Sequence, residues 1–325
     1  MADVRIGISG WTYPPWRGTF FPKGLAQRLE LHYASRQVSS IEINGTFYSL
    51  QTARSYQAWA EQVPDDFIFS VKGGRFITHI LRLKNVELPL ANFFASGVLR
   101  LGKKLGPILW QLPPSFRYDR ERLATFFKLL PRDTRAAAVL AKKHNDKVKD
   151  PWLEPGPLRP LRHAIEVRHE SFKTPEFIAL LRTHGTALVV ADTARKWPFM
   201  EDVTADFVYV RLHGDAELYV SGYTPAALEE WRRKVAAWSR GQNPARTERV
   251  APLAASRAAG RDVYVYFDND VKTRAPFDAM TLAYLLKLGP KPAEPPPIES
   301  ITEVARTEWP SYPSTKRKPQ KLSRS

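Results

Sequence analysis

The sequence contains no cysteine. The protein therefore forms no disulfide, has no cysteine-bound iron–sulfur cluster and uses no thiolate nucleophile. A chain without disulfides suits a reducing compartment, so we expect it in the cytoplasm. The sequence also lacks any run of 18 or more apolar residues, and we expect no membrane-spanning helix and no membrane partner. Its first residues enter a strand-like run without the apolar core of a signal peptide.

Acidic residues are scarce relative to basic ones. Lys and Arg number 49 against 33 Asp and Glu, which gives a net charge of +16 and a pI near 10.0. This excess favours anionic partners, either nucleic acid or an anionic small molecule. A proteome that uses arginine generously would produce the same balance without such a partner. The 325 residues are 43% hydrophobic, which is enough for one large domain, and single α/β barrels of ~250 residues are common.

Residues 40–48 show a pattern that recurs along the chain. Ile41 and Ile43 alternate with Glu42 and Asn44. Because successive side chains of a strand point to opposite faces, the two isoleucines share one face and the carboxylate and amide share the other. The strand stops at Gly45, and an aromatic loop follows. This pattern is typical of a strand that carries polar groups to one edge of a sheet.

Eight short strands are expected, mostly separated by helical segments. Strands that alternate with helices indicate βαβ units and a parallel sheet. Eight of them in this length favour a closed (β/α)8 TIM barrel. An open doubly wound sheet is the alternative, but residues 7–12 lack the glycine-rich phosphate turn that it requires. The expected strands are residues 4–9, 40–44, 67–72, 107–111, 162–168, 186–191, 207–213 and 263–267.

Three connections depart from the regular repeat. Residues 75–90 are expected to form a long loop and residues 90–105 a helix, whereas residues 132–160 read as an irregular insertion rich in charge and proline. The segment between the sixth and seventh strands is too short for a full helix. We expect a single barrel domain over residues 1–289. Residues 290–325 are proline-rich and basic, and we expect a disordered tail there.

The candidate site follows from the ends of the strands, where TIM barrels carry their active sites. Three pairs two residues apart, Glu42/Asn44, Glu166/Arg168 and Arg211/His213, would point into the barrel, because the residue between each pair is apolar. We predict acid–base roles for Glu42, Glu166 and His213. The predicted substrate-binding and anion-binding residues are Asn44, Lys72, His79, Gln111, Arg168, Arg211, Asn269, Trp11 and Tyr48.

Eight runs of sequence carry a resemblance to a known family. They occur in order along the chain, which resembles the YecE-like family, a domain-of-unknown-function family with a TIM-barrel fold, over about residues 4–287. The resemblance implies the barrel but supplies no reaction. One departure is Asp268, where the resemblance implies Asn, and it alters the charge at the end of the eighth strand. The runs are G-I-S-G-W-T-Y-P-P-W (7–16), I-E-I-N-G-T-F-Y (41–48), F-I-F-S-V-K (67–72), I-T-H (77–79), L-W-Q-L-P-P-S-F (109–116), A-I-E-V-R-H (164–169), Y-V-R-L-H-G (209–214) and V-Y-V-Y-F-D-N-D (263–270).

Several chemistries fit these residue types, and the sequence does not choose between them. The strand-end carboxylates Glu42, Glu166, Asp192 and Asp268 include pairs of the kind that glycosidases use. Together with His79, His169 and His213 they are also candidate ligands for a divalent metal, so the cofactor stays open. Lys72 is a candidate Schiff-base nucleophile. A buried lattice of salt bridges without catalytic function would show the same residues.

We therefore expect an enzyme, a hydrolase or an isomerase, that acts on an anionic, phosphate-bearing substrate at the mouth of the barrel. A sugar phosphate, a nucleotide or nucleic acid would meet this description. The alternative is a non-catalytic nucleic-acid-binding barrel that uses its basic surface and its aromatic mouth.

Overall fold

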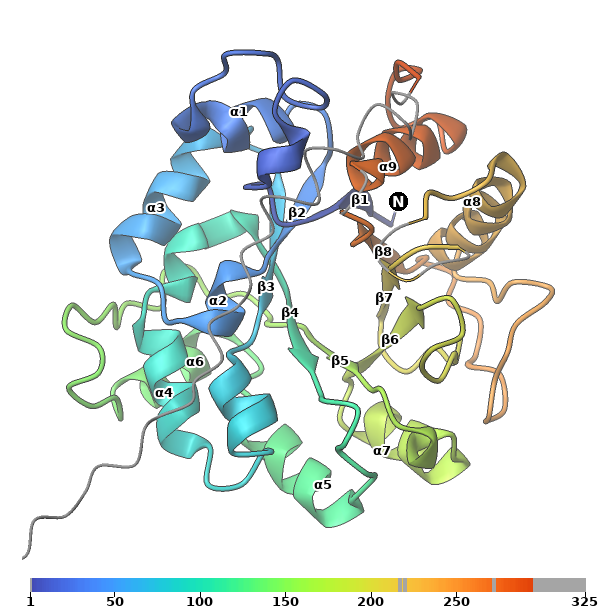
Figure 1. The fold of residues 1–325 in the computed structure, drawn as a ribbon. Helices are drawn as coiled ribbons and strands as arrows, with labels where there is room; N and C mark the ends of the chain where they lie inside the picture. Colours follow the sequence, from blue (N-terminus) through green and yellow to red (C-terminus); the bar gives the residue numbers. More distant parts are fainter. Residues whose placement is uncertain (1, 216–217, 219–220, 271–272, 295–325) are drawn as a thin grey trace, which may run out of the picture.

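The computed structural model describes residues 2–215, 218, 221–270 and 273–294. Its strands close into a parallel barrel in which each strand pairs with its neighbours in sequence and β8 pairs with β1 (Figure 1). The predicted TIM barrel is thereby confirmed. The strands are β1 Val4–Ser9, β2 Ser40–Ile43, β3 Ile68–Lys72, β4 Leu105–Gln111, β5 His163–Glu166, β6 Ala187–Asp192, β7 Phe207–Leu212 and β8 Asp262–Phe267.

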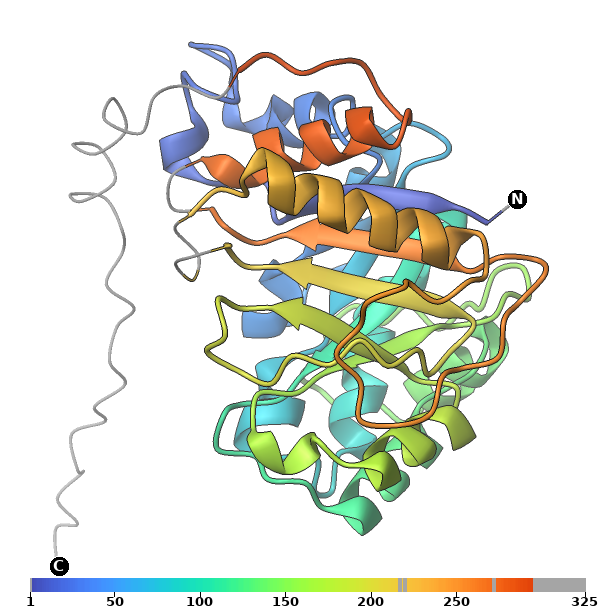
Figure 2. The same ribbon diagram turned by 90° about the vertical axis from the view of Figure 1, so that its right-hand side faces the viewer.

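Helices cover the outside of this barrel, as Figures 1 and 2 show. Several begin at a residue whose side chain caps the first turn, such as Thr52, Asp119 and Thr174. The α-helices are α1 Glu30–Ala34, α2 Gly45–Tyr48, α3 Ala53–Gln62, α4 Glu87–Ala95, α5 Arg120–Leu129, α6 Thr134–Ala141, α7 Pro175–Thr183, α8 Pro225–Ser239 and α9 Arg274–Leu285. Short 3-10 segments lie at Pro14–Trp16, Gln27–Leu29, Val98–Lys104 and Glu170–Phe172, and a π-helical turn lies at Phe76–Ile80.

Three local expectations need correction. The insertion at residues 132–160 contains α6, which Asp133 caps and which packs against α4. The helix expected over residues 90–105 ends at Ala95, because Gly97 takes a left-handed conformation with φ of 110° and a 3-10 segment follows. The long loop at residues 75–90 contains the π-helical turn and the start of α4. As expected, no helix lies among residues 193–206, between β6 and β7.

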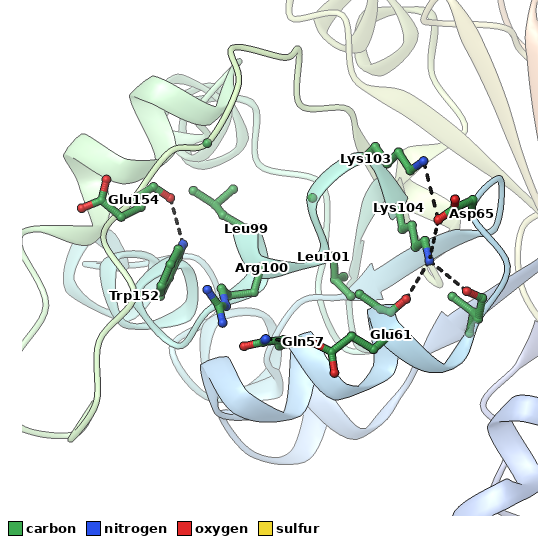
Figure 3. A pocket seen from close by; sticks show the side chains of 14 residues that line it. Gln57, Glu61, Asp65, Leu99, Arg100, Leu101, Lys103, Lys104, Trp152 and Glu154 are labelled. Carbon is green, nitrogen blue, oxygen red and sulfur yellow. Dashed lines mark hydrogen bonds and ion pairs between the residues drawn. The ribbon is translucent and has the colours of Figure 1, made fainter.

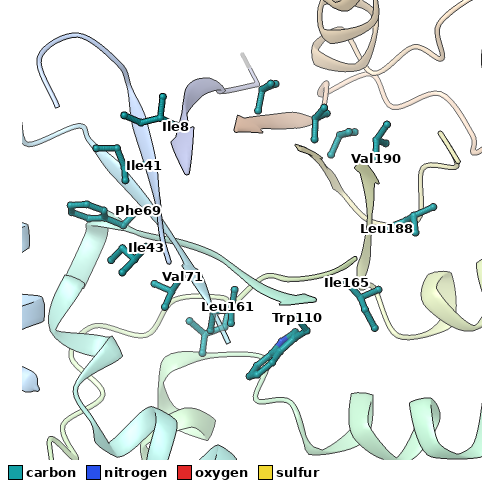
Figure 4. Close-up of a cluster of buried hydrophobic side chains, with 14 of the residues drawn as sticks. Ile8, Ile41, Ile43, Phe69, Val71, Trp110, Leu161, Ile165, Leu188 and Val190 are labelled. Atoms are coloured by element: carbon teal, nitrogen blue, oxygen red, sulfur yellow. The ribbon is translucent and has the colours of Figure 1, made fainter. Parts of the chain in front are cut away.

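The outward faces of the strands are apolar, and β4 to β8 also carry apolar side chains on their inward faces. The outward side chains pack under the helices, and Figure 4 shows Ile8, Ile41, Phe69 and Val190 among them. This arrangement is typical of a parallel sheet that helices cover. The inward face has a separate cluster formed by Leu109, Ala164, Ala187, Val189, Ala191, Phe207, Tyr209, Tyr264 and Tyr266.

Two inward tyrosines divide the barrel interior into an apolar part and a polar part. The hydroxyls of Tyr209 and Tyr266 each lie 2.7 Å from a serine hydroxyl, that of Ser70 and that of Ser40 respectively. Buried tyrosine hydroxyls need such partners. Beyond these tyrosines, toward the C-terminal ends of the strands, the inward side chains are polar or charged, and the candidate site begins there.

Two further sequence-based expectations concern the surroundings of the barrel. None of the described helices is long and apolar enough to cross a membrane. The predicted boundary at residue 289 and the predicted tail stay predictions, because residues 295–325 lie outside the described part of the chain.

We expect Gly7→Ala to destabilise the barrel strongly. A Cβ atom at this position would lie 1.8 Å from the carbonyl oxygen of Ser40, the residue that pairs with Gly7 in the adjacent strand. Because a closed barrel backbone cannot shift aside, the free energy of unfolding should fall by about 3 kcal/mol. Urea denaturation measures it. Gly45→Ala is the matched control, since its nearest foreign atom lies 3.7 Å away; an equal loss in both variants would contradict the steric explanation.

Candidate functional site

Arg211 lies at the centre of the polar ring inside the barrel. Its side chain is 0% exposed and comes from β7. The guanidinium Nη2 donates to Glu42 Oε1 at 2.9 Å and to Asp268 Oδ2 at 2.8 Å, and Nη1 donates to Glu166 Oε2 at 2.7 Å. One cation thus joins carboxylates from the ends of β2, β5 and β8. Although burial lowers the pKa of Arg211, these carboxylates outweigh burial and hold it well above its usual value.

Glu42 also accepts hydrogen bonds from two hydroxyl groups. Its Oε1 accepts a hydrogen bond from Ser9 Oγ at 3.1 Å, and its Oε2 accepts one from Tyr209 Oη at 2.5 Å. Both carboxylate oxygens therefore have partners, as a buried charge requires. The Tyr209 hydroxyl joins this ring to the serine layer beneath it.

Glu166 is shared between two arginines. Besides Arg211, it accepts a hydrogen bond from Arg168 Nε at 2.7 Å. Arg168 in turn stacks on Trp197, with the guanidinium carbon 3.8 Å from the ring centroid. Burial raises the pKa of Glu166, but Arg168 and Arg211 outweigh burial and hold it well below its usual range. Glu166 is therefore an ionised group at neutral pH.

His213 and Asp268 form a second pair at this end of the barrel. His213 Nδ1 lies 3.0 Å from Asp268 Oδ2, and its Nε2 lies 3.4 Å from Arg211 Nη1. Burial, followed by the positive charge of Arg211, lowers the pKa of His213, so the ring is neutral at pH 7. Burial raises the pKa of Asp268, but Arg211 and His213 reverse this and lower it below its usual value.

Lys72, at the end of β3, has a different environment. Its Nζ lies 4.6 Å from the centroid of Phe47, and the His79 ring packs edge-on against the same phenyl group at 5.0 Å. No described residue forms an ion pair or a hydrogen bond with this Nζ, although the side chain is only 8% exposed. Burial, followed by the charge of Arg211, lowers the pKa of Lys72 to about 8.

A zone of positive charge surrounds His79. Burial, followed by the positive charges of Lys72, Arg168 and Arg75, lowers the pKa of His79 to about 4. Its Nδ1 lies 2.9 Å from Thr78 Oγ1. Arg75 is exposed, and within the described ranges its guanidinium has neither a hydrogen-bond partner nor an ion-pair partner. His79 is therefore a neutral group beside two cations that lack a carboxylate partner.

Several polar atoms near this ring are buried without a partner. Gln111, at the end of β4, is 5% exposed. Its side-chain amide neither donates a hydrogen bond to a described residue nor accepts one from it. Asn44 Oδ1 and Asp270 Oδ1 are also buried without hydrogen-bond partners in the described part of the chain. Burial, followed by the charge of Asp268, raises the pKa of Asp270 well above its usual value. Buried polar groups normally have partners, so these atoms mark places where a ligand can bind.

The predicted residues thus fall into two groups. The ring includes Glu42, Glu166, Arg168, Arg211 and His213, and the same end of the barrel includes Asn44, Lys72, His79 and Gln111. The structure places Asn269 and Trp11 against the helices, whereas Tyr48 stays next to Phe47, the ring that Lys72 and His79 contact. Asn269 lies on the helix-facing side of β8, where it donates to Asp278 Oδ2 at 2.8 Å. Trp11 packs against Trp59 and Phe69, and Tyr48 is exposed beside Phe47.

Sequence reasoning missed two members of the ring and misplaced one carboxylate. Tyr209 precedes Arg211 by two residues, and Asp270 follows Asp268 by two, so strand periodicity would have placed both inside the barrel. The same periodicity puts Asp192 on the outward face of β6, where Tyr223 Oη donates to it at 3.1 Å. The loop residue Trp197 had no such signal, because its position depends on the fold of the β6–β7 connection.

The carboxylates do not form a metal site. In the described ranges, no group of three or more His, Asp and Glu side chains is close enough to hold a metal ion. Glu42, Glu166 and Asp268 instead point at the guanidinium of Arg211. His169 lies outside the ring, where it caps a 3-10 turn through Ser171. These donors do not fit the divalent metal considered from the sequence.

A pocket of about 610 Å³ also lies on the outside of the barrel, between α3 and the 3-10 segment Val98–Lys104 (Figure 3). Two lysines there point at Asp65. Lys104 Nζ also donates to the carbonyl oxygens of Ala60 and Val63 at 2.7 and 2.9 Å. Lys104 is 8% exposed, as Lys72 is, but its ammonium group has partners.

We expect Arg211→Met to destabilise the protein by about 3–5 kcal/mol at pH 7, because three buried carboxylates would lose their shared counter-ion. Without Arg211, burial should raise the pKa values of Glu166 and Asp268, so the variant should regain stability as the pH falls from 8 to 5. In the wild-type protein the pKa values of Glu166 and Asp268 are lowered, so its stability should instead fall as the pH drops below about 4. Thermal denaturation across this pH range measures both trends.

Arg162→Met is the matched control for this prediction. Arg162 also joins two carboxylates, Asp206 and Asp262, but it lies at the opposite end of the barrel and its side chain is 27% exposed. Its loss should cost about 1 kcal/mol. Equal costs for the two variants, or a wild-type-like pH profile for Arg211→Met, would show that the ring is not a buried electrostatic unit.

Comparison with known proteins assigns this barrel to a family. Residues 5–300 match the sequence profile described as Protein of unknown function DUF72. UPF0759 protein YunF of Bacillus subtilis is 27% identical over 129 residues, and UPF0759 protein YecE of Escherichia coli is 28% identical over 113 residues. These matches cover 37% and 35% of this chain and 44% and 39% of those proteins. The chain therefore spans less than half the length of the curated relatives in these matches.

Solved structures extend the likeness over nearly the whole barrel. The crystal structure of a DUF72 family protein from Thermotoga maritima superposes with a TM-score of 0.67 at 24% identity, over 88% of this chain and 99% of that one. A DUF72 family protein from Enterococcus faecalis gives a TM-score of 0.62 at 17% identity, over 90% and 100%. These two structures support the fold. The resemblance to the YecE-like family is confirmed, and the chain belongs to the DUF72 family.

Proposed function

We propose that this protein is an enzyme that binds an anionic, phosphate-bearing substrate at the C-terminal mouth of its barrel. The observation that carries the proposal is Lys72, a largely buried cation for which no described residue supplies a counter-ion. A largely buried ammonium group without a counter-ion lowers the free energy of unfolding unless a ligand neutralises its charge. A phosphate or carboxylate group on the substrate would supply the missing charge.

The neighbours of Lys72 support an anion rather than a cation. Arg75 adds a second positive charge without a carboxylate partner in the described chain, and His79 beside it is neutral. The carboxylates of the ring are turned toward Arg211. An anion that approaches from the side of β3 and β4 therefore meets Lys72, Arg75 and the free amide of Gln111 first. This combination is typical of phosphate recognition.

The rest of the ring supplies groups for proton transfer. Glu166 is ionised, so it suits the role of a proton acceptor rather than that of a donor. Glu42 holds the orientation of Arg211. His213, neutral and paired with Asp268, is the candidate proton carrier. We propose that these groups catalyse hydrolysis or isomerisation of the bound substrate.

We expect inorganic phosphate and ribose 5-phosphate to bind to the wild-type protein. Lys72→Met should weaken that binding by about tenfold or more, because one charge-assisted hydrogen bond is lost. Because the pKa of Lys72 is about 8, wild-type affinity should fall as the pH rises through 8. Arg75→Gln should weaken binding without this change in pH dependence. Isothermal titration calorimetry between pH 6.5 and 9.5 measures these effects.

Lys104→Met is the control, because that lysine is equally buried but has protein partners. It should leave phosphate affinity unchanged. Affinity that is equal in the wild-type protein and Lys72→Met would contradict the proposal. Tight binding of duplex DNA that falls steeply with salt and does not depend on Lys72 would favour the non-catalytic nucleic-acid-binding alternative, which rests on the net charge of +16.

The two lysine variants should also differ in stability. The folded-state pKa of Lys72 lies below its unfolded-state value, so its charge lowers the free energy of unfolding below pH 8, and this loss disappears as the pH rises toward 10.5. Lys72→Met should therefore be as stable as the wild-type protein or more stable at pH 7. Lys104→Met should lose about 1–3 kcal/mol, because two buried carbonyl groups lose their donor. Guanidinium denaturation at pH 7 distinguishes the variants, and a large loss for Lys72→Met would show that its ammonium group has a structural role.

A further inference from the structure

We infer that Lys72 is a covalent catalyst whose Nζ forms an imine with the carbonyl carbon of the substrate. This inference rests on the proposed function and narrows its substrate class to aldehydes or ketones that also carry a phosphate or carboxylate group. In that case Arg75 holds the anionic group of the substrate, and Lys72 attacks the carbonyl group.

The first argument compares Lys72 with other largely buried lysines. Lys104 Nζ donates to two backbone carbonyl groups, and Lys234 Nζ lies 2.6 Å from Glu201 Oε1. Such partners accept hydrogen bonds from the ammonium group and hold the amine in its charged form, which has no lone pair for attack. Among the described residues, Lys72 Nζ contacts the Phe47 ring, and none of the described carboxylates comes within 4.0 Å of it. Lys72 is thus positioned as a nucleophile, whereas the other two lysines are positioned as structural cations.

The second argument is the charge around the amine. Four charged groups act on it: Arg211 on β7 lowers its pKa, whereas Glu42 on β2, Glu166 on β5 and Asp268 just after β8 raise it. The neutral His79 lies across the Phe47 ring. With burial as the largest effect, the pKa of about 8 leaves about one Lys72 in ten neutral at pH 7, against fewer than about one in a thousand for an ordinary lysine. Burial and a neighbouring cation are the means by which enzymes activate a lysine amine.

The third argument is the place of Lys72 in the fold. It is the last residue of β3 and points inward at the end of the barrel where TIM-barrel enzymes carry out their chemistry. Gln111 lies on the adjacent strand and on the same face, two residues beyond Leu109, the register partner of Lys72. Its amide has no hydrogen-bond partner among the described residues, so it is free to donate to the carbonyl oxygen of a substrate.

The step itself balances without a further reactant. The lone pair of neutral Nζ attacks the carbonyl carbon, the C=O π bond breaks, and the oxygen takes up a proton. The attacking nitrogen gives up one of its two protons, which balances the proton gained by the oxygen. The resulting carbinolamine loses one water molecule, made of its hydroxyl group and the one proton that remains on nitrogen, and the C=N bond forms. Hydrolysis reverses the sequence. The neutral His213 and the ionised Glu166 are the nearby groups that can move these protons.

Reductive trapping with two matched probes tests the inference. The full chain is incubated at pH 8 with pyridoxal 5′-phosphate or with pyridoxal, which lacks the phosphate group, and sodium borohydride then reduces any imine to a stable secondary amine. Peptide mass spectrometry locates the modified lysines. We expect Lys72 to be modified about tenfold or more faster than Lys103, whose side chain is 68% exposed, because more of its amine is neutral. We also expect the phosphate-bearing probe to react faster than pyridoxal.

Variants separate this inference from the proposed function on which it rests. Arg75→Gln should remove the preference for the phosphate-bearing probe while Lys72 still reacts with pyridoxal, and Lys104→Met should behave as the wild-type protein does. Rapid reaction of Lys72 with both probes at equal rates would support the imine and contradict the anion site. Phosphate binding by calorimetry without modification of Lys72 by either probe, or modification of Lys72 no faster than that of Lys103, would overturn the imine and leave the anion site standing.

Discussion

The ion cluster around Arg211 is the constraint on which the mouth of this barrel depends. A guanidinium and three carboxylates lie together almost out of reach of water, and each of these groups would be costly there alone. Planar donors in a fixed fork geometry let one arginine hold side chains from three other strands. The cluster therefore fixes the ends of β2, β5, β7 and β8 relative to one another. The groups beside it then face the mouth at defined positions.

This cluster also explains why Lys72 is unusual. The three nearby carboxylates are turned toward Arg211, so the lysine at the end of β3 has no ion-pair partner among the residues that the structure describes, although charged groups surround it. We propose that this amine binds an anion or reacts as a nucleophile. Both proposed roles rest on one property, an ammonium group that has no ion-pair partner among the described residues. The contrast with Lys104, equally buried and fully hydrogen-bonded, shows that burial alone does not produce this property.

Alternation along the strands was sufficient to place much of the candidate site. Glu42, Glu166, Arg168, Arg211 and His213 share the inward face because apolar residues separate each pair, and the structure brings them together. The same rule was not applied to Asn269 and Asp192. Each follows an inward-pointing residue by one position and therefore faces the helices. Trp11 packs against Trp59 of α3 and Phe69 of β3. Sequence patterns do not give the distances between strand ends.

The sequence by itself determined the closed barrel, the end of it that carries the polar groups, and the lack of thiol chemistry, because strand number, side-chain period and composition are local properties. It also identified Lys72, Glu166 and Arg211 as residues of interest. Only the tertiary structure decided which charges pair. Charge pairing depends on distances of a few ångströms between strands that are far apart in the chain, and those distances exist only once the barrel has closed. For that reason the sequence left Lys72 as one cation among many, and the fold made it a largely buried lysine without an ion-pair partner in the described part of the chain.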